Sequence, residues 1–193
     1  MSLWADFLTN KQRLISKWPH YFPVYERHME RFRGRPCRLL EIGVYQGGSL
    51  QMWKRYLGPL AEIVGIDIDP RCLFEEPQIE VRTGNQADAR FLESLGAFDI
   101  VIDDGSHLAA DTTAAFNALY PATRGIYLVE DLRGQDSFLN FCRRLVALND
   151  DSAFTRQTQS IHFYDSIVVF EKGDHPPASQ DIKTGFPADW SVK

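Results

Sequence analysis

The stretch Val101-Ile102-Asp103-Asp104-Gly105-Ser106-His107 decides the fold, because an apolar run ends there in two carboxylates and an imidazole. A second apolar run, residues 126–129, ends in the same way at Glu130 and Asp131. Open parallel sheets bind ligands outside the carboxyl ends of their strands. If both runs are neighbouring strands, their acids meet at one edge of the sheet. Such a group of oxygen donors predicts a divalent metal site.

Short apolar runs alternate with helical patterns after Cys37, which predicts βαβ units and a parallel sheet. The expected strands are 38–42, 63–66, 79–81, 98–102 and 126–129. Two more runs, 160–164 and 167–171, lie two residues apart, and this spacing is typical of an antiparallel hairpin. We therefore predict an α/β domain with a seven-stranded, mostly parallel sheet and an antiparallel C-terminal hairpin.

The chain divides into three expected segments. Residues 1–35 form an N-terminal helical extension, with a helical pattern over 3–33 that Pro19 and Pro23 interrupt. Residues 36–172 carry the sheet, with a further helix around 137–148. Residues 173–193 contain three prolines and little periodicity, so they are expected to form an irregular tail.

Composition excludes several function classes. The 193 residues are 44% hydrophobic, which is enough for a real core. A net charge of -5 lacks the basic field that nucleic-acid binding requires. Cys37, Cys72 and Cys142 are far apart and lack metal-binding spacing, so they are expected to be buried or free thiols. No run of about twenty apolar residues is present, so we expect a cytoplasmic protein without a membrane span.

A glycine-containing turn follows the first expected strand. Residues 41–49 read Glu-Ile-Gly-Val-Tyr-Gln-Gly-Gly-Ser and precede a helical stretch, so backbone N–H groups are open to a small ligand. Tyr45 stands where a dinucleotide fingerprint needs glycine, which argues against NAD. Asp67 ends the second strand, where a carboxylate can accept hydrogen bonds from a ribose diol. The alternative for Asp67 is a helix cap or a solvated loop residue.

These motifs resemble those of the class I S-adenosylmethionine-dependent methyltransferases, which have a Rossmann-like methyltransferase fold. Within that class the chain is similar to the metal-dependent O-methyltransferases of macrolide and rhamnosyl sugars, and it also resembles the cephalosporin hydroxylase-like proteins. The resemblance covers about residues 17–172 and rests on five stretches. They are Leu40-Glu41-Ile42-Gly43-Val44, Gly65-Ile66-Asp67-Ile68-Asp69-Pro70, Ile102-Asp103-Asp104-Gly105-Ser106-His107, Val129-Glu130-Asp131-Leu132 and Ile161-His162-Phe163-Tyr164-Asp165-Ser166.

The resemblance implies a role for each matched residue. Asp104, Glu130 and Asp131 would hold a magnesium ion, and His107 would be the general base. Magnesium is preferred over zinc, and three carboxylates could also hold manganese or calcium. Asp67 would bind the cofactor's ribose and Gln86 would face its adenine. The methionine end of S-adenosylmethionine would be lined by Glu41, Gly43, Tyr45, Gly47 and Ser49.

Each of these residues could instead have a purely structural role. Asp103 and Asp104 could cap the following helix, Glu130 and Asp131 could be a solvated strand end, and His107 could be an exposed residue. His162 is expected to be a sheet residue, and His28 receives no assignment. The aromatic residues of the N-terminal segment are expected to be core or interface residues rather than acceptor-stacking ones: Trp18, Tyr21, Phe22 and Tyr25.

The sequence therefore predicts a natural-product O-methyltransferase with S-adenosyl-L-methionine and Mg²⁺ as cofactors and a small-molecule hydroxyl as acceptor. Two alternatives stay open: a cephalosporin hydroxylase-like protein with the same fold and metal site, and a module that binds S-adenosylmethionine without catalysis. Nucleic acid and membranes are not expected as partners, and a homo-oligomer is left open.

Overall fold

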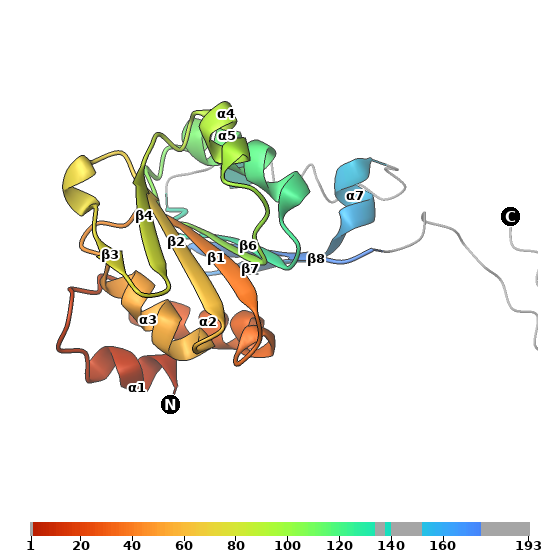
Figure 1. Ribbon diagram of the computed structural model, residues 1–193. Helices are drawn as coiled ribbons and strands as arrows, with labels where there is room; N and C mark the ends of the chain where they lie inside the picture. The colour runs from red at the N-terminus through yellow and green to blue at the C-terminus, as the bar shows by residue number, and fades with distance from the viewer. Residues whose placement is uncertain (1, 134–137, 140–151, 175–193) are drawn as a thin grey trace, which may run out of the picture.

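The computed structural model describes residues 2–133, 138–139 and 152–174. Within these residues one eight-stranded sheet runs through the centre in the order β3-β4-β2-β1-β5-β6-β8-β7 (Figure 1). The strands are β1 Cys37–Ile42, β2 Ala61–Asp67, β3 Glu75–Glu76, β4 Ile79–Thr83, β5 Ile100–Asp103, β6 Ile126–Val129, β7 Thr158–Tyr164 and β8 Ile167–Lys172.

The predicted fold is confirmed. Strands β4, β2, β1, β5 and β6 are parallel neighbours, and β8 and β7 are antiparallel to the strands beside them. The seven expected strands are all present. The additional strand, β3, pairs antiparallel with β4 through two residues. A strand this short has no alternating pattern, so the sequence could not predict it.

Helices cover both faces of the sheet, so the described part of the chain has three layers (Figure 1). On one face lie α1 Leu3–Leu8, α2 Phe22–Met29 and α3 Gly48–Leu57, and on the other α4 Ala89–Ser94 and α5 Ala109–Leu119. Trp53 and Tyr25 are fully buried in the apolar cluster on the α1–α3 face of the sheet. Phe116 is buried in the apolar cluster on the α4–α5 face. Shorter helices are η1 Pro19–Tyr21, η2 Glu30–Phe32, η3 Pro70–Cys72, η4 Tyr120–Ala122 and α7 Ala153–Gln157.

The predicted helical pattern over 3–33 is wrong for residues 10–18. Helix α1 ends at Leu8, and the Asn10 side chain then bonds the backbone of Gln12 and Arg13 in a local turn. Such side-chain bonds compete with helical ones. The segment crosses the N-terminus of α3 so closely that a Cβ on Gly48 would lie 2.2 Å from the Leu14 carbonyl oxygen. This crossing brings Lys17 to the carboxyl edge of the sheet.

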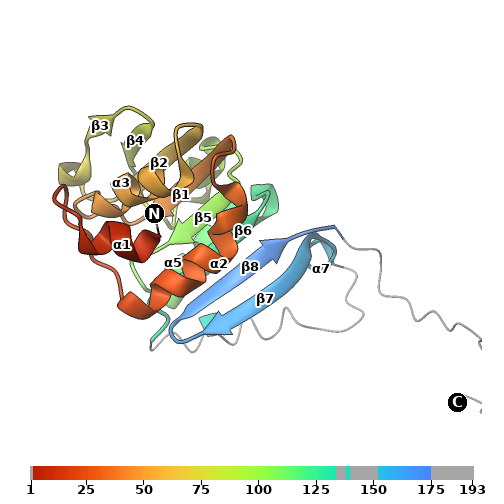
Figure 2. The same ribbon diagram turned by 90° about the horizontal axis from the view of Figure 1, so that it is seen from below.

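Helix α2 runs beside the hairpin of β7 and β8 (Figure 2). Its residues Phe22 and Tyr25 share one buried cluster with β1 and β2, so the N-terminal segment contributes to the core of the sheet. The expected helix around 137–148 and the expected tail fall almost wholly outside the described residues. Among the helices that the structure describes, none is long and apolar enough to cross a bilayer.

Candidate active site

The site forms where β1, β5 and β6 end side by side. Ile42 of β1 is in register with Asp103 of β5, and Asp103 is in register with Val129 of β6. The residues that follow these strands therefore meet at one edge. Gly43, the first of them, has φ +91°, and a Cβ there would lie 2.1 Å from the backbone oxygen of Asp104. Only glycine permits this approach.

Lys17 is the central cation of the site. Its Nζ lies 2.6 Å from Asp104 Oδ2, 2.9 Å from Glu41 Oε1 and 3.0 Å from Glu130 Oε2. The side chains of Lys17, Glu41 and Glu130 are at most 2% exposed. A buried charge requires a partner of opposite sign, and here one ammonium serves three carboxylates.

The protonation equilibria follow from this arrangement. Burial acts to lower the pKa of Lys17, but attraction by Asp104, Glu130 and Glu41 outweighs burial and holds that pKa well above its ordinary value. Burial raises the pKa of Glu130 and of Glu41, and the charge of Lys17 opposes this rise in both. The ionised state of the two glutamates therefore depends on Lys17.

Asp104, His107 and Asp131 form a second group on the open side of Lys17. Each offers one ligand atom, and these atoms all lie within 4.8 Å of one another. His107 Nε2 is 4.0 Å from Asp104 Oδ1 and 3.9 Å from Asp131 Oδ2, and the imidazole is 41% exposed. Asp104 is thus held through Oδ2 by Lys17 while Oδ1 faces the histidine.

The backbone at this group is strained. His107 has φ +56° and Asp131 has φ +53°, in the left-handed region that side chains other than glycine rarely adopt. Tyr21 fixes Asp131, because its hydroxyl donates to Asp131 Oδ1 at 2.7 Å and accepts the Asp131 backbone N–H at 3.2 Å. Strain that the surroundings maintain is typical of functional sites.

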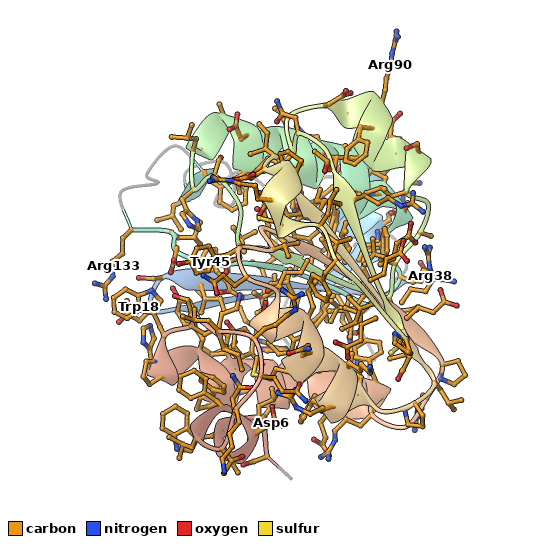
Figure 3. All side chains as sticks on the ribbon, turned by 60° about the vertical axis from the view of Figure 1, so that its left-hand side comes forward. Asp6, Trp18, Arg38, Tyr45, Arg90 and Arg133 are labelled. Atoms are coloured by element: carbon orange, nitrogen blue, oxygen red, sulfur yellow. The ribbon has the colours of Figure 1, made fainter. Side chains whose placement is uncertain are left out.

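A cavity of about 360 Å³ joins this group to the glycine turn. Figure 3 views this edge of the molecule, with Tyr45 and Trp18 labelled beside it. Several predicted cofactor residues line the cavity together with the acids and the histidine: Gly43, Tyr45, Ser49, Asp67, Asp104, His107 and Asp131.

Two predicted cofactor residues have structural partners instead of a place on this cavity. Glu41 is fully buried and accepts hydrogen bonds from Ser49 Oγ at 2.7 Å and Trp53 Nε1 at 3.2 Å, in addition to its pairing with Lys17. Gly47, with φ +78°, is the N-cap residue of α3 and packs against Phe74.

Asp67 organises the turn that it faces. Its Oδ2 accepts the backbone N–H groups of Val44 and Tyr45 at 2.9 and 3.0 Å, and its Oδ1 accepts that of Asp69 at 2.9 Å. It also lines both this cavity and an adjoining one of about 250 Å³.

Gln86 lines the adjoining cavity and is itself held in place. Its Oε1 accepts the Ser106 N–H at 2.6 Å, and its Nε2 donates to Asp103 Oδ1 at 3.4 Å. Burial raises the pKa of Asp103 to about 7, against the hydrogen bonds that Gly105, Tyr127 and Gln86 donate.

Trp18 differs from the other aromatic residues of the N-terminal segment. Tyr21, Phe22 and Tyr25 are buried as expected, whereas the Trp18 side chain is 49% exposed. It lines a further cavity of about 380 Å³ together with Lys17, Asp104, Glu130 and Asp131. The Arg133 guanidinium lies 5.3 Å from its ring centroid, and Figure 3 shows the two side chains together. Trp18 is therefore a wall of the site.

Sequence reasoning missed Lys17 and the bond from Tyr21 to Asp131. Neither residue lies in a recognisable spacing pattern, because Lys17 is 87 positions from Asp104 and Tyr21 is 110 positions from Asp131 along the chain. The only signal was their position in a lead-in segment rich in aromatic residues.

Sequence comparison finds relatives of the chain among known O-methyltransferases. No protein-family model matches the chain. The 8-demethyl-8-(2-methoxy-alpha-L-rhamnosyl)-tetracenomycin-C 3'-O-methyltransferase of Streptomyces olivaceus is 45% identical over 128 residues, which are 60% of this chain and 33% of the relative. The mycinamicin VI 2''-O-methyltransferase of Micromonospora griseorubida is 42% identical over 127 residues, 58% of this chain and 32% of the relative. These relatives are macrolide and sugar O-methyltransferases.

A solved structure matches nearly the whole chain. The MycE methyltransferase of the mycinamycin biosynthetic pathway, in complex with Mg, SAH and mycinamycin VI, superimposes with a TM-score of 0.76 at 30% identity. The match covers 97% of this chain and 56% of MycE. The Rossmann-like methyltransferase fold and the resemblance predicted from the sequence are confirmed. The chain spans about one third of the length of the two curated relatives.

Proposed function

We propose that the chain transfers a methyl group from S-adenosylmethionine to a sugar hydroxyl of a natural product, with the help of a divalent cation. One observation carries this proposal: the group of Asp104, His107 and Asp131 opens into the same cavity as the glycine turn and Asp67. A cofactor in this cavity would place its reactive end beside the acids and the imidazole. The named relatives and MycE support the choice of reaction.

The residues fit the cofactor. The cavity of about 360 Å³ is lined by the polar side chains of Ser49 and Asp67 as well as by Asp104 and Asp131. Asp67 would accept from the ribose, Ser49 would contact the methionine end, and Gln86 in the adjoining cavity would face the adenine. S-adenosylmethionine would supply an electrophilic methyl group on a sulfonium.

The residues also fit a hard divalent cation, because carboxylate oxygens converge and no cysteine of the described residues lies among them. Asp104 and Asp131 would be the first ligands. Glu130, the third predicted ligand, contacts Lys17 and would have to release this contact in order to bind the cation. When bound, the ion would lower the pKa of an acceptor hydroxyl and fix its position.

His107 would be the general base. Its imidazole is half exposed at the cavity and faces both acids at about 4 Å without a hydrogen bond, so it is open to a hydroxyl proton. Such a base contributes about 10²- to 10⁴-fold to turnover.

The acceptor would enter beside Trp18. This ring and the acids line one cavity of about 380 Å³, so a sugar stacked on the indole would direct a hydroxyl towards Asp104 and Asp131. The rhamnosyl and macrolide names of the relatives make a deoxysugar the acceptor class to test first.

The test is methyl transfer from labelled S-adenosylmethionine to a panel of rhamnosylated polyketides and glycosylated macrolides, with and without EDTA. We expect product that depends on added Mg²⁺ and is lost in Asp104→Asn. The control is Asp165→Asn, because Asp165 is an exposed acid outside the three cavities described above. Undiminished product after exhaustive EDTA treatment would reject the role of the cation. Binding of S-adenosylhomocysteine without transfer to any member of the panel would favour a binding module.

A further inference from the structure

A second group of metal-ligating side chains lies between α2 and the C-terminal hairpin. His28 of α2, His162 of β7 and Glu171 of β8 each offer a ligand atom within 4.8 Å of the others. His28 Nδ1 is 2.6 Å from Glu171 Oε1, and the two imidazole centroids are 4.7 Å apart at an interplanar angle of 61°. The group shares no residue with the candidate active site.

Each of the three side chains has an outer partner that fixes its orientation. His28 Nε2 lies 2.8 Å from the Tyr164 hydroxyl, and His162 Nε2 lies 2.9 Å from Ser160 Oγ. The second oxygen of Glu171 lies 3.6 Å from Arg31 Nη1. Metal-ligating histidines characteristically use the other ring nitrogen for such a bond, which sets the tautomer and the ring direction.

The three side chains supply suitable donors for a metal. His28 and His162 each offer an imidazole nitrogen, and Glu171 offers a carboxylate oxygen. Imidazole and carboxylate are donors that bind metal ions in their unprotonated forms.

The position of the group allows an ion to enter. The His28 side chain is buried, but the Glu171 side chain is 18% exposed and that of Arg31, its ion-pair partner, is 45% exposed. An ion arriving from solvent would replace the hydrogen bond between His28 and Glu171. It would then connect α2 to both strands of the hairpin, which lie beside it in Figure 2.

We propose that His28, His162 and Glu171 form a second metal site, which takes a zinc-class divalent cation and clamps α2 to the hairpin of β7 and β8. Two imidazoles and one carboxylate are a donor set that zinc uses with water as fourth ligand. Magnesium is disfavoured, because it requires oxygen ligands and near-octahedral geometry. The proposal does not depend on the methyltransferase activity.

The experiment is calorimetric titration of the tag-free, reduced chain with ZnCl₂. It is carried out in an Asp104→Asn background so that the carboxylates of the candidate active site bind less metal. We expect one equivalent of zinc and a rise in the melting temperature of about 5–11 °C at a hundredfold excess over Kd. Adding Glu171→Gln should weaken zinc binding at least about 100-fold while keeping an amide oxygen for the bond from His28.

His20→Ala in the same background is the matched control, because His20 is a neighbouring histidine outside the group. It should leave the zinc affinity unchanged. His162→Ala should also remove the zinc equivalent and the visible absorption bands of a bound Co²⁺ ion. Equal zinc affinity and equal Co²⁺ spectra in the Glu171→Gln and His162→Ala variants and their parent would overturn the proposal and leave a hydrogen-bonded network only.

Discussion

Replacing Lys17 by methionine should test the charge arrangement of the site. Methionine keeps most of the side-chain volume and removes the ammonium, so Glu41 and Glu130 are left buried without their cation. Removing one partner of a buried ion pair costs about 3–5 kcal/mol. We expect a loss of this size in the free energy of unfolding at pH 8, measured by urea denaturation.

The loss should be smaller at pH 5.5, and the sign follows from proton binding. Burial raises the pKa of Glu41 and Glu130 above the ordinary value of 4.5, and without Lys17 the rise is larger. The folded variant then holds protons that the unfolded chain has released. Its stability therefore falls as the pH rises above about 4.5.

Lys54→Met is the matched control. Lys54 also pairs with a glutamate, Glu76, at 2.6 Å, but both side chains are more than 20% exposed. Such a surface pair contributes about 0–1 kcal/mol. A Lys17→Met loss below about 1 kcal/mol at pH 8, or one equal to that of Lys54→Met, would refute the reasoning.

Three further predictions follow from individual residues. Burial raises the pKa of Asp103 from 3.8 to about 7. Between these two pH values Asp103 is protonated in the folded protein and ionised in the unfolded protein. The contribution of Asp103 to the free energy of unfolding therefore falls by up to about 1.4 kcal/mol for each pH unit of rise across this range. Between pH 4 and 7, the free energy of unfolding of Asp103→Asn, measured by denaturation, should change less with pH than that of the wild type. An unchanged pH dependence would mean that a group other than Asp103 causes it. Because His107 has φ +56°, the His107→Gly variant should be about 1 kcal/mol more stable than the His107→Ala variant. Both variants should lose about 10²- to 10⁴-fold in kcat. Equal stability of the two variants would argue against backbone strain at this position. Trp18→Ala should raise the KM for the acceptor about tenfold, which corresponds to about 1.4 kcal/mol of stacking energy. The affinity for S-adenosylhomocysteine should stay within about twofold of the wild-type value. A selective loss of S-adenosylhomocysteine affinity would instead place Trp18 at the cofactor.

The sheet could be predicted because its strands have strong local signals. The runs at 38–42, 98–102 and 126–129 are short, apolar and followed by turn residues, and the hairpin at 160–171 is marked by its two-residue loop. The acids of the site could be predicted for the same reason, since strand ends in a parallel sheet must converge.

The role of the N-terminal segment could not be predicted in this way. Lys17 lies in a stretch with helical periodicity, yet contacts with the start of α3 and the turn at Asn10 override that pattern. Two of its three carboxylate partners, Asp104 and Glu130, follow strands far along the chain. The contact of His28 with Glu171 could likewise not be predicted from the sequence, because it depends on how α2 crosses the hairpin of β7 and β8.

The most direct test of the account is a crystal structure of the chain with S-adenosylhomocysteine and Mn²⁺, with anomalous data collected at the manganese edge. We predict an anomalous peak in contact with Asp104 and Asp131, and the cofactor product in the cavity lined by Asp67 and Ser49. S-adenosylhomocysteine bound with no peak at these two carboxylates, or a peak away from the cofactor cavity, would contradict the account.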